Sequence, residues 1–294
     1  KVNCISCNMC SLVCPHGVIR PYLLTDEEYE KAPEYVREKC IETSIKNKLY
    51  KFTIAINVAN CTGCGLCFNT CPGKKGVKAL TMKDVDTLLK EREQRRFEYL
   101  DKYIKEKNVL DKFTIKGSQL IKPKFAYPGA CAGCGETAYL KLMSQLFGDN
   151  LVVANATGCS SIYSASYPSM AYNVPWANSL FEDNAEFGLG MYLADKTMKE
   201  NIFSIVKKKI NDEDDETLEI YDGYLAGLKD FDKKLYDLVV KEKDKDLLPY
   251  KNYIKEKTFF IVGGDGWAYD IGFSGIDHVL ASDANVNILV LDTE

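Results

Sequence analysis

The sequence predicts an α+β domain followed by an α/β domain with a mostly parallel sheet and helices on both faces. Three observations support this fold class. The 294 residues are about twice the length of an ordinary domain. One cysteine pattern occurs twice before residue 73. From residue 123 onward, short apolar strand patterns alternate with helical patterns and glycine-containing turns.

The composition is that of a globular chain. A content of 46% hydrophobic and 27% charged residues excludes collagen-like, mucin-like and generally disordered proteins. Basic and acidic residues are intermixed and sum to a net charge of -4, so we expect no nucleic-acid partner. No apolar run approaches the roughly 18 residues of a membrane span. Because the sequence starts at Lys1 and stops directly after an apolar strand pattern, we expect it to be an internal piece of a longer chain.

The first domain, expected at residues 1–82, carries the duplicated cysteine pattern Cys-x2-Cys-x2-Cys-x3-Cys-Pro. Three thiolates at this spacing on a tight loop can reach three irons of one cubane cluster, and the fourth, just before the proline, ligates the partner cluster. The pattern therefore predicts two 4Fe-4S clusters, one held by Cys4, Cys7, Cys10 and Cys71, the other by Cys61, Cys64, Cys67 and Cys14.

A disulfide scaffold and zinc sites are the alternatives for these cysteines. A chain with this hydrophobic content does not need disulfides to stabilise its fold. Zinc sites use two Cys-x2-Cys pairs, and a third cysteine at the same spacing followed by x3-Cys-Pro has no role in them. We therefore favour iron–sulfur clusters.

The duplicated motif resembles that of bacterial two-cluster ferredoxins, except that Cys61 follows Cys4 by 57 residues. We therefore expect an insertion at residues 20–55, with a surface helix from Thr25 to Lys39. Residues 83–122 are expected to form a helical linker, because charged and apolar residues alternate at helical spacing from 83 to 112. The last domain is then expected at residues 123–294.

A third cysteine group lies in this last domain. Cys131 and Cys134 precede an expected helix, Thr137 to Phe147, and Cys159 follows an expected strand. Ligands of open α/β sheets bind at the carboxyl ends of strands. Alone, Cys-x2-Cys is equally typical of a redox pair or half a zinc site, but the upstream motifs favour a third iron–sulfur cluster. Its fourth ligand is expected beyond Glu294 or on another chain.

Gly264-Asp265-Gly266 follows another apolar strand pattern and precedes an expected helix (270–281) and strand (286–291). Glycines allow the backbone to approach a diphosphate, and an aspartate can ligate the Mg²⁺ that bridges two phosphates. A surface turn is the common alternative for such a short motif. Thr293 would return to the same edge of the sheet and could donate a second oxygen to the metal.

The order of these motifs resembles the C-terminal part of the pyruvate:ferredoxin (flavodoxin) oxidoreductases. Besides the duplicated motif, it rests on Cys-Ala-Gly-Cys-Gly-Glu (131–136), Thr-Gly-Cys-Ser-Ser (157–161), Ser-Leu-Phe-Glu-Asp-Asn-Ala-Glu-Phe-Gly (179–188) and Gly-Asp-Gly-Trp-Ala-Tyr-Asp-Ile-Gly (264–272). The resemblance implies a thiamine-diphosphate enzyme that oxidatively decarboxylates pyruvate with coenzyme A to acetyl-CoA and CO2. Electrons would pass singly through three 4Fe-4S clusters to ferredoxin or flavodoxin.

The resemblance also implies roles for individual residues. Cys131, Cys134 and Cys159 would ligate the third cluster, and Asp265 and Thr293 would ligate Mg²⁺. Contacts to thiamine diphosphate are expected from Glu136, Cys159, Gly264, Asp265, Gly266, Trp267, Thr293 and Glu294. No catalytic acid or base is expected in this chain. The activating glutamate, the substrate-binding residues and the coenzyme A site are expected on an absent domain, so the chain alone should be inactive.

The implied partners are ferredoxin or flavodoxin, pyruvate, coenzyme A, the remainder of the same polypeptide, and a second copy in a homodimer of the full-length protein. The expected location is the cytoplasm, or an organelle such as a hydrogenosome in a eukaryote. Three alternatives stay open: an oxidoreductase for another 2-oxo acid, a pyruvate:NADP oxidoreductase fusion, and a pure iron–sulfur electron carrier. The Gly-Asp-Gly segment argues against a pure electron carrier, because such a carrier would not need a diphosphate site.

Overall fold

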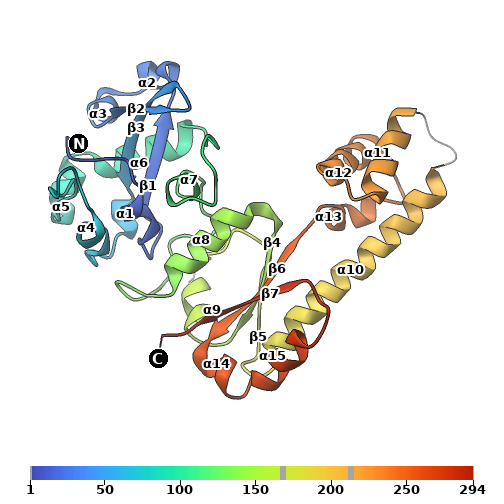
Figure 1. Cartoon of the computed structure of the whole chain (residues 1–294). Helices are drawn as coiled ribbons and strands as arrows, with labels where there is room; N and C mark the ends of the chain where they lie inside the picture. The colour runs from blue at the N-terminus through green and yellow to red at the C-terminus, as the bar shows by residue number, and fades with distance from the viewer. Residues whose placement is uncertain (1, 166–169, 211–214, 294) are drawn as a thin grey trace. The chain divides into compact units, whose positions relative to one another are not determined.

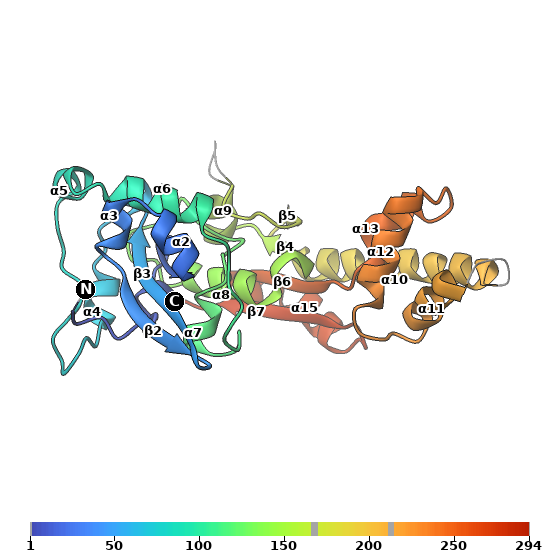
Figure 2. The same ribbon diagram turned by 90° about the horizontal axis from the view of Figure 1, so that it is seen from above.

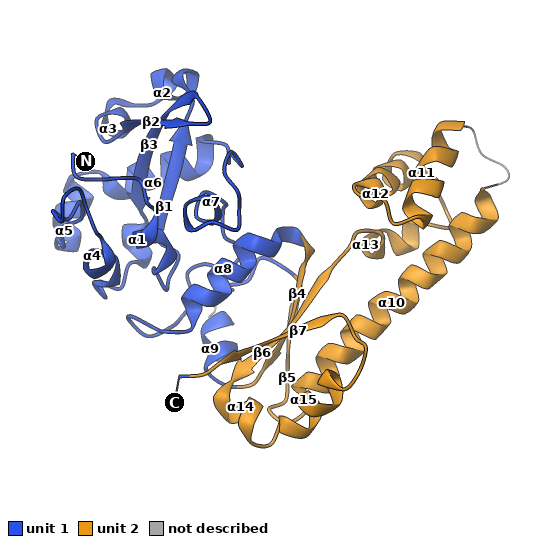
Figure 3. Cartoon of the chain, in the orientation of Figure 1, with its two compact units in different colours: residues 1–149, 158–174, 293 blue, residues 150–157, 175–292, 294 orange. Residues whose placement is uncertain are grey.

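The computed structural model describes residues 2–165, 170–210 and 215–293 (Figures 1 and 2). By their contacts, the described residues divide into two compact units: 1–149 with 158–174 and 293, and 150–157 with 175–292 and 294 (Figure 3). Residues 123–149 and 158–174 thus group with the cysteine motifs, whereas composition predicts a boundary after residue 122. Composition detects where residue types change, not which segments pack together, so the predicted domain bounds stay a prediction.

The expected insertion at 20–55 supplies most of the only sheet that the described residues of the first unit form. This sheet is antiparallel, with strand order β1 (Ile19–Leu24), β3 (Lys48–Ile56) and β2 (Ile41–Ile45). Strand β3 alternates buried and more exposed side chains over much of its length, as expected of a strand with one face against the core. The insertion is therefore an integral part of the core.

The single helix expected from Thr25 to Lys39 is two short helices, α2 (Asp26–Lys31) and α3 (Glu34–Arg37). Helix α2 begins with a capping box, in which the Thr25 hydroxyl accepts from the Glu28 amide and the Glu28 carboxylate accepts from the Thr25 amide. Pro33 separates the two helices, because the residue before a proline is disfavoured in helical conformation.

The expected linker helix is also divided. Helix α5 (Val85–Lys90) and helix α6 (Glu93–Tyr103) are separated at Arg92, whose φ of 61° is left-handed, and residues 104–112 are not helical. Phe97 and Leu100 of α6 are buried in an apolar cluster with residues of α3 and the sheet. This burial explains the apolar spacing on which the helix prediction was based.

Three further helices complete the first unit. Helix α7 (Ile115–Ser118) precedes α8 (Thr137–Phe147), whose bounds are those predicted from the sequence, and α9 (Cys159–Ser164) comes last. A short 3-10 helix, η2 (Gly148–Asn150), follows α8. The side-chain amide of Gln119, the residue directly after α7, donates to the side-chain amide oxygen of Gln145 in α8 at 3.0 Å, and this hydrogen bond is buried.

The second unit contains a parallel four-stranded sheet, which confirms the α/β prediction in its coarser form. The strand order is β5 (Trp176–Ser179), β4 (Leu151–Ala156), β6 (Thr258–Gly264) and β7 (Val286–Leu291). Every residue of β4 is buried, as is typical of a central parallel strand covered on both faces. Apolar residues of β4 and β6 share one core with helices α10 (Asn184–Lys209), α14 (Asp265–Tyr269) and α15 (Phe273–Leu280).

From its many charged residues, the sequence predicts that the segment from 196 to 257 forms surface helices covering the sheet, with a solvated loop at 211–216. The structure does not show this arrangement. Helices α11 (Asp215–Leu225), α12 (Phe231–Glu242) and α13 (Lys251–Ile254), with η3 (Leu248–Tyr250), pack on one another and on the distal half of α10 around a core of their own. The predicted loop 211–216 lies largely outside the described residues, and its last two residues begin α11. The interspersed Leu, Tyr and Phe residues form this second core.

Candidate functional site

The two cysteine motifs adopt the same backbone conformation. Each contains one short helix, α1 (Met9–Leu12) or α4 (Leu66–Thr70), and these two helices pack against each other. A 3-10 helix, η1 (Val58–Asn60), leads into the second motif. In both motifs the residues directly before and directly after the second cysteine have left-handed φ angles. The four residues are Ser6 (50°), Asn8 (64°), Gly63 (68°) and Gly65 (79°).

The crossed cysteine sets predicted from the sequence line two separate cavities. The first cysteine cavity, of about 230 Å³, is lined by Cys4, Cys7, Cys10 and Cys71 among other residues. The second cysteine cavity, of about 120 Å³, is lined by Cys14, Cys61, Cys64 and Cys67 among others. One water needs roughly 10–15 Å³, so each cavity has room for a polyatomic group. All twelve cysteines are free thiols.

The thiols within each cavity interact electrostatically. Burial, together with the nearby thiols of Cys4, Cys7 and Cys71 and of Cys67 from the other cavity, raises the pKa of Cys10 to about 12. Burial, together with the nearby thiols of Cys14, Cys61 and Cys64, raises the pKa of Cys67 to about 11. Both thiols therefore carry protons at neutral pH without a metal, and binding of iron would have to displace those protons.

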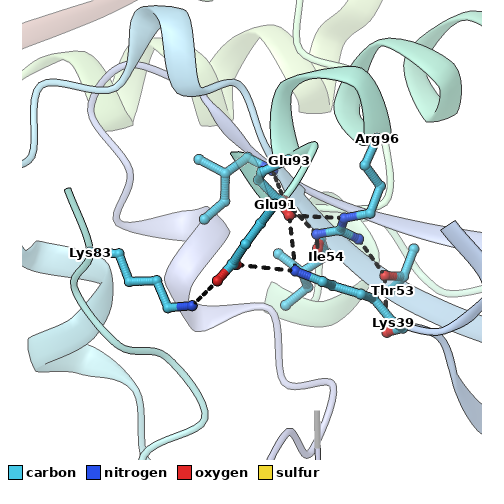
Figure 4. Close-up of polar contacts among 8 residues, drawn as sticks. Lys39, Thr53, Ile54, Lys83, Glu91, Glu93 and Arg96 are labelled. Atoms are coloured by element: carbon cyan, nitrogen blue, oxygen red, sulfur yellow. Dashed lines mark hydrogen bonds and ion pairs between the residues drawn. The ribbon is translucent and has the colours of Figure 1, made fainter. Parts of the chain in front are cut away.

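A network of charged side chains forms one wall of the first cysteine cavity (Figure 4). The Arg96 guanidinium and the Glu93 carboxylate are both about 95% buried and form an ion pair, and Arg96 also donates to the Thr53 hydroxyl at 2.8 Å. The Lys39 ammonium lies 3.6 Å from the Glu93 and Glu91 carboxylates, and Glu91 also pairs with Lys83. Each charged group on this wall thus has a partner of opposite charge.

The third cysteine group lies in the same compact unit. Cys131 and Cys159 are exposed, Cys134 is half-buried, and Cys159 is the first residue of α9. The Gly129 amide donates to the Tyr163 carbonyl at 2.9 Å, which ties the loop before Cys131 to α9.

Glu136 is buried, and the Tyr163 hydroxyl donates to its carboxylate at 2.8 Å. Burial and the adjacent Glu136 carboxylate raise the pKa of Tyr163. Tyr163 thus fixes the carboxylate at the start of α8. No sequence motif predicts a role for this tyrosine.

The loop of the third group lies beside the second cysteine cavity. The Nε2 atom of His16, a residue lining that cavity, is 3.1 Å from the Ala130 carbonyl, directly before Cys131. A Cβ atom added to Gly133 would stand 3.7 Å from Cβ of Cys64. Two independent contacts therefore join these cysteine groups.

In the second unit, Asp265 stands directly after strand β6. Strands β6 and β7 are parallel, with Gly264 in register with Leu291, and the Tyr269 hydroxyl donates to the Asp292 carboxylate at 2.8 Å. Among the described residues, the structure gives the Asp265 carboxylate no hydrogen-bond or ion-pair partner. A Cβ atom on Gly264 would meet nothing closer than 3.9 Å. This end of the strand thus offers an oxygen ligand and an open approach to the backbone.

The Trp267 side chain is buried, unlike the open site at Gly264 and Asp265. Its side chain is fully buried in the core of the second unit, and Cβ atoms on Gly263 and Gly272 would lie 2.3 and 2.4 Å from its ring. These two glycines therefore make room for the indole. Any contact of Trp267 with a cofactor would have to come from its backbone.

The remaining predicted residues lie at the end of the chain. Thr293 is exposed and is the second residue after β7, and Glu294 lies outside the described residues. Within the described ranges, no three His, Cys, Asp or Glu side chains converge on a point where they could hold a single metal ion. A cubane cluster takes one thiolate per iron, so its ligands surround a cavity and do not converge on one ion. No described helix is both long and apolar enough to span a bilayer.

A family model described as a 4Fe-4S dicluster domain matches residues 3–77. The pyruvate:ferredoxin oxidoreductase of Moorella thermoacetica is 44% identical over 99% of this chain and 27% of its own length. The pyruvate-flavodoxin oxidoreductase of Enterobacter agglomerans is 41% identical over 99% of this chain and 26% of its own length. The mitochondrial pyruvate dehydrogenase [NADP(+)] of Euglena gracilis is 40% identical over 99% of this chain and 17% of its own length.

The chain thus spans about a quarter of the length of the first two relatives. The similarity extends over both compact units and not only over the dicluster domain. The resemblance inferred from the motifs is therefore confirmed: over nearly all of its length, this chain is homologous to a segment of the pyruvate:ferredoxin and pyruvate-flavodoxin oxidoreductases.

Proposed function

We propose that this chain is the electron-relay and thiamine-diphosphate-binding part of a pyruvate:ferredoxin or pyruvate:flavodoxin oxidoreductase. In that reaction pyruvate and coenzyme A yield acetyl-CoA, CO2, one proton and two electrons, and the electrons leave singly to the carrier. The observation that carries the proposal is the pair of cavities lined by crossed sets of four cysteines. The names of the homologous proteins support the reaction.

The cysteine cavities suit iron–sulfur clusters in both shape and chemistry. Each has four thiols around a space larger than one ion needs, and the raised thiol pKa values lead us to expect proton release on ligation. When bound, 4Fe-4S clusters accept and release one electron at a time. Cys131, Cys134 and Cys159 are proposed to hold a third cluster, with a fourth ligand from outside this chain.

The contacts of His16 and Gly133 suggest an order for the relay. They hold the third cysteine group beside the second cysteine cavity. Ile56, Leu80, Thr81, Lys83 and Leu88 line both cavities, so the two cavities share a wall. We therefore place the second cysteine cavity in the middle of the relay and the first at its far end.

The strand end at Gly264 and Asp265 suits a magnesium-bound diphosphate. The open space at Gly264 allows a phosphate to approach the backbone, and the Asp265 carboxylate supplies the hard oxygen ligand that Mg²⁺ prefers. When bound, thiamine diphosphate supplies the carbon nucleophile for a 2-oxo acid. Roles for Glu136, Cys159 and Thr293 rest on the resemblance alone.

Substitution of Asp265 tests the cofactor assignment. In the full-length protein, Asp265→Ala should abolish retention of thiamine diphosphate while leaving the visible iron–sulfur spectrum intact, because Asp265 is in the other compact unit from the cysteines. Asp277→Ala, which removes an exposed carboxylate from α15, is the matched control. Retention of the cofactor by Asp265→Ala would contradict the assignment, and an absence of bound thiamine in the wild type would favour a pure electron carrier.

The names of some relatives support NADP⁺ as an alternative electron acceptor. Proteins named pyruvate dehydrogenase [NADP(+)], from Euglena gracilis and Cryptosporidium parvum, are 40% and 36% identical to this chain. Anaerobic assay of the full-length protein with pyruvate, coenzyme A and either ferredoxin, flavodoxin or NADP⁺ would separate these acceptors.

A further inference from the structure

Lys141 of α8 is a buried lysine that the proposed reaction does not use. It is 1% exposed, and its neighbour Leu140 is fully buried. The Lys141 ammonium donates to the backbone carbonyls of Ser11, of Leu12 at 3.1 Å and of Cys14 at 3.2 Å. All three N–H groups of the ammonium therefore have acceptors in one short segment.

This segment is the carboxyl end of helix α1 and the turn after it, where carbonyls carry partial negative charge. The Ser11 and Cys14 carbonyls also accept from the Cys14 and Gly17 amides, at 3.2 and 3.3 Å. Neutral donors such as amides could satisfy such carbonyls at a lower cost of burial, because an ammonium loses its hydration when it is buried. The hydrogen bonds alone therefore do not explain why a positively charged side chain is buried at this position.

The position of the ammonium suggests what the charge does. Cys10, a residue of the first cysteine cavity, lies within α1, and Cys14, a residue of the second, accepts one of the three hydrogen bonds. A fixed positive charge in a medium of low dielectric stabilises the more negative, reduced form of a nearby redox group. Lys141 is placed to act on both cavities.

We propose that Lys141 is a positioning residue that fixes the segment from Ser11 to Cys14 and raises the reduction potentials of the clusters in both cysteine cavities. This inference rests on the proposed function, because it requires that the cysteines bind clusters. It also links the third cysteine group to the relay. Helix α8, which carries Lys141, begins three residues after Cys134.

Potentiometric titration followed by EPR tests the proposal in the full-length protein. Lys141→Gln keeps two N–H donors and removes the charge, and Lys141→Met removes both. In either variant we expect the balance between reduced and oxidised cluster to shift at least tenfold toward the oxidised form, which is about 59 mV for a one-electron couple. Lys141→Arg, which keeps the charge, should keep the potentials near those of the wild type.

Lys112→Gln is the matched control, because the exposed Lys112 also donates to a backbone carbonyl of α8, that of Leu146, at 2.7 Å. Loss of iron from both neutral variants, with retention by Lys141→Arg, would support the positioning role. Unchanged potentials in a neutral variant that keeps its clusters would overturn the proposal. A wild-type protein without iron and acid-labile sulfide would instead refute the proposed function.

Discussion

Each of the two cysteine cavities is lined by four thiols, but the residues that surround the thiols differ. The wall of the first cavity includes Lys39, Lys83, Glu91, Glu93 and Arg96. Among the described residues lining the second cavity, Lys83 is the one Lys, Arg, Asp or Glu side chain, and most of the others are apolar, such as Val18, Val58, Leu66 and Val85. The repeated motif therefore specifies the ligands, while the segments around it specify the environment.

This difference has a physical consequence for electron transfer. Reduction adds one negative charge to a cluster, and its free energy depends on nearby charges, hydrogen bonds and burial. The charged residues around the first cavity come from α6 and from the segments before β2 and α6, which lie outside the cysteine motifs. Two clusters with identical ligands can thus have different potentials, as a directional relay requires.

Pairs of cysteine substitutions should have the largest effect, which is the loss of whole clusters. They test whether each cluster takes three cysteines from one motif and the fourth from the other. Cys71→Ala should remove one cluster, or about four irons per chain. Cys4 lines the same cavity as Cys71, whereas Cys61 lines the other. Adding Cys4→Ala should therefore cost no further iron, whereas adding Cys61→Ala should cost about four more.

Iron and acid-labile sulfide analysis of anaerobically purified protein provides the measurement. Cys40→Ala is the control, because Cys40 is buried outside both cavities and its thiol donates to the Val36 carbonyl at 3.4 Å. If each motif instead held its own cluster, the Cys71→Ala and Cys61→Ala pair would lose only one cluster. That result would contradict the crossed pairing.

Breaking the buried Glu93–Arg96 pair should have the next largest effect. Glu93→Gln leaves the Arg96 guanidinium without its opposite charge in a buried site, and such changes typically cost about 3–5 kcal/mol of folding free energy. In protein that still folds, the unopposed positive charge should raise the potential of the cluster in the first cavity and leave the second unchanged. Arg96→Met should lower it, because Glu93 then lacks its partner.

Thermal unfolding and redox titration measure the two effects. Glu98→Gln, an exposed position on the same helix, should change stability by less than about 0.5 kcal/mol. Equal shifts of both cluster potentials in Glu93→Gln would show that the charged wall does not distinguish the cavities.

The sequence predicted most accurately those features that depend on local spacing. The bounds of α8 and β7 follow from patterns within a few residues of one another. The crossed cysteine sets line separate cavities, and their ligation of clusters stays a prediction. The sequence did not predict that the insertion forms a sheet, or that Arg92 would divide the linker helix. Both depend on packing between segments far apart in the chain, which periodicity does not report.

The candidate site shows the same limit. Lys141, Tyr163 and Arg96 were missed because their partners, Cys14, Glu136 and Thr53, are between 27 and 127 residues away. One signal was available for Lys141, which interrupts the apolar run Leu140 to Met143 of a predicted helix. A charge within the buried stripe of a helix requires a partner.

The smallest expected effect comes from charges introduced at the rim of the second cavity. Met82 lines this cavity and is 51% exposed, so a charge there is tolerated but screened by water and salt. Met82→Lys should raise, and Met82→Glu should lower, the potential of the cluster in the second cavity, each by less than the roughly 59 mV of a tenfold change. Met82→Gln should leave it unchanged, and higher ionic strength should reduce both shifts. Shifts of the same sign in the two charged variants would mean that the substitutions disturb the cavity and do not act through charge, and the comparison of the two walls would then lose its electrostatic basis.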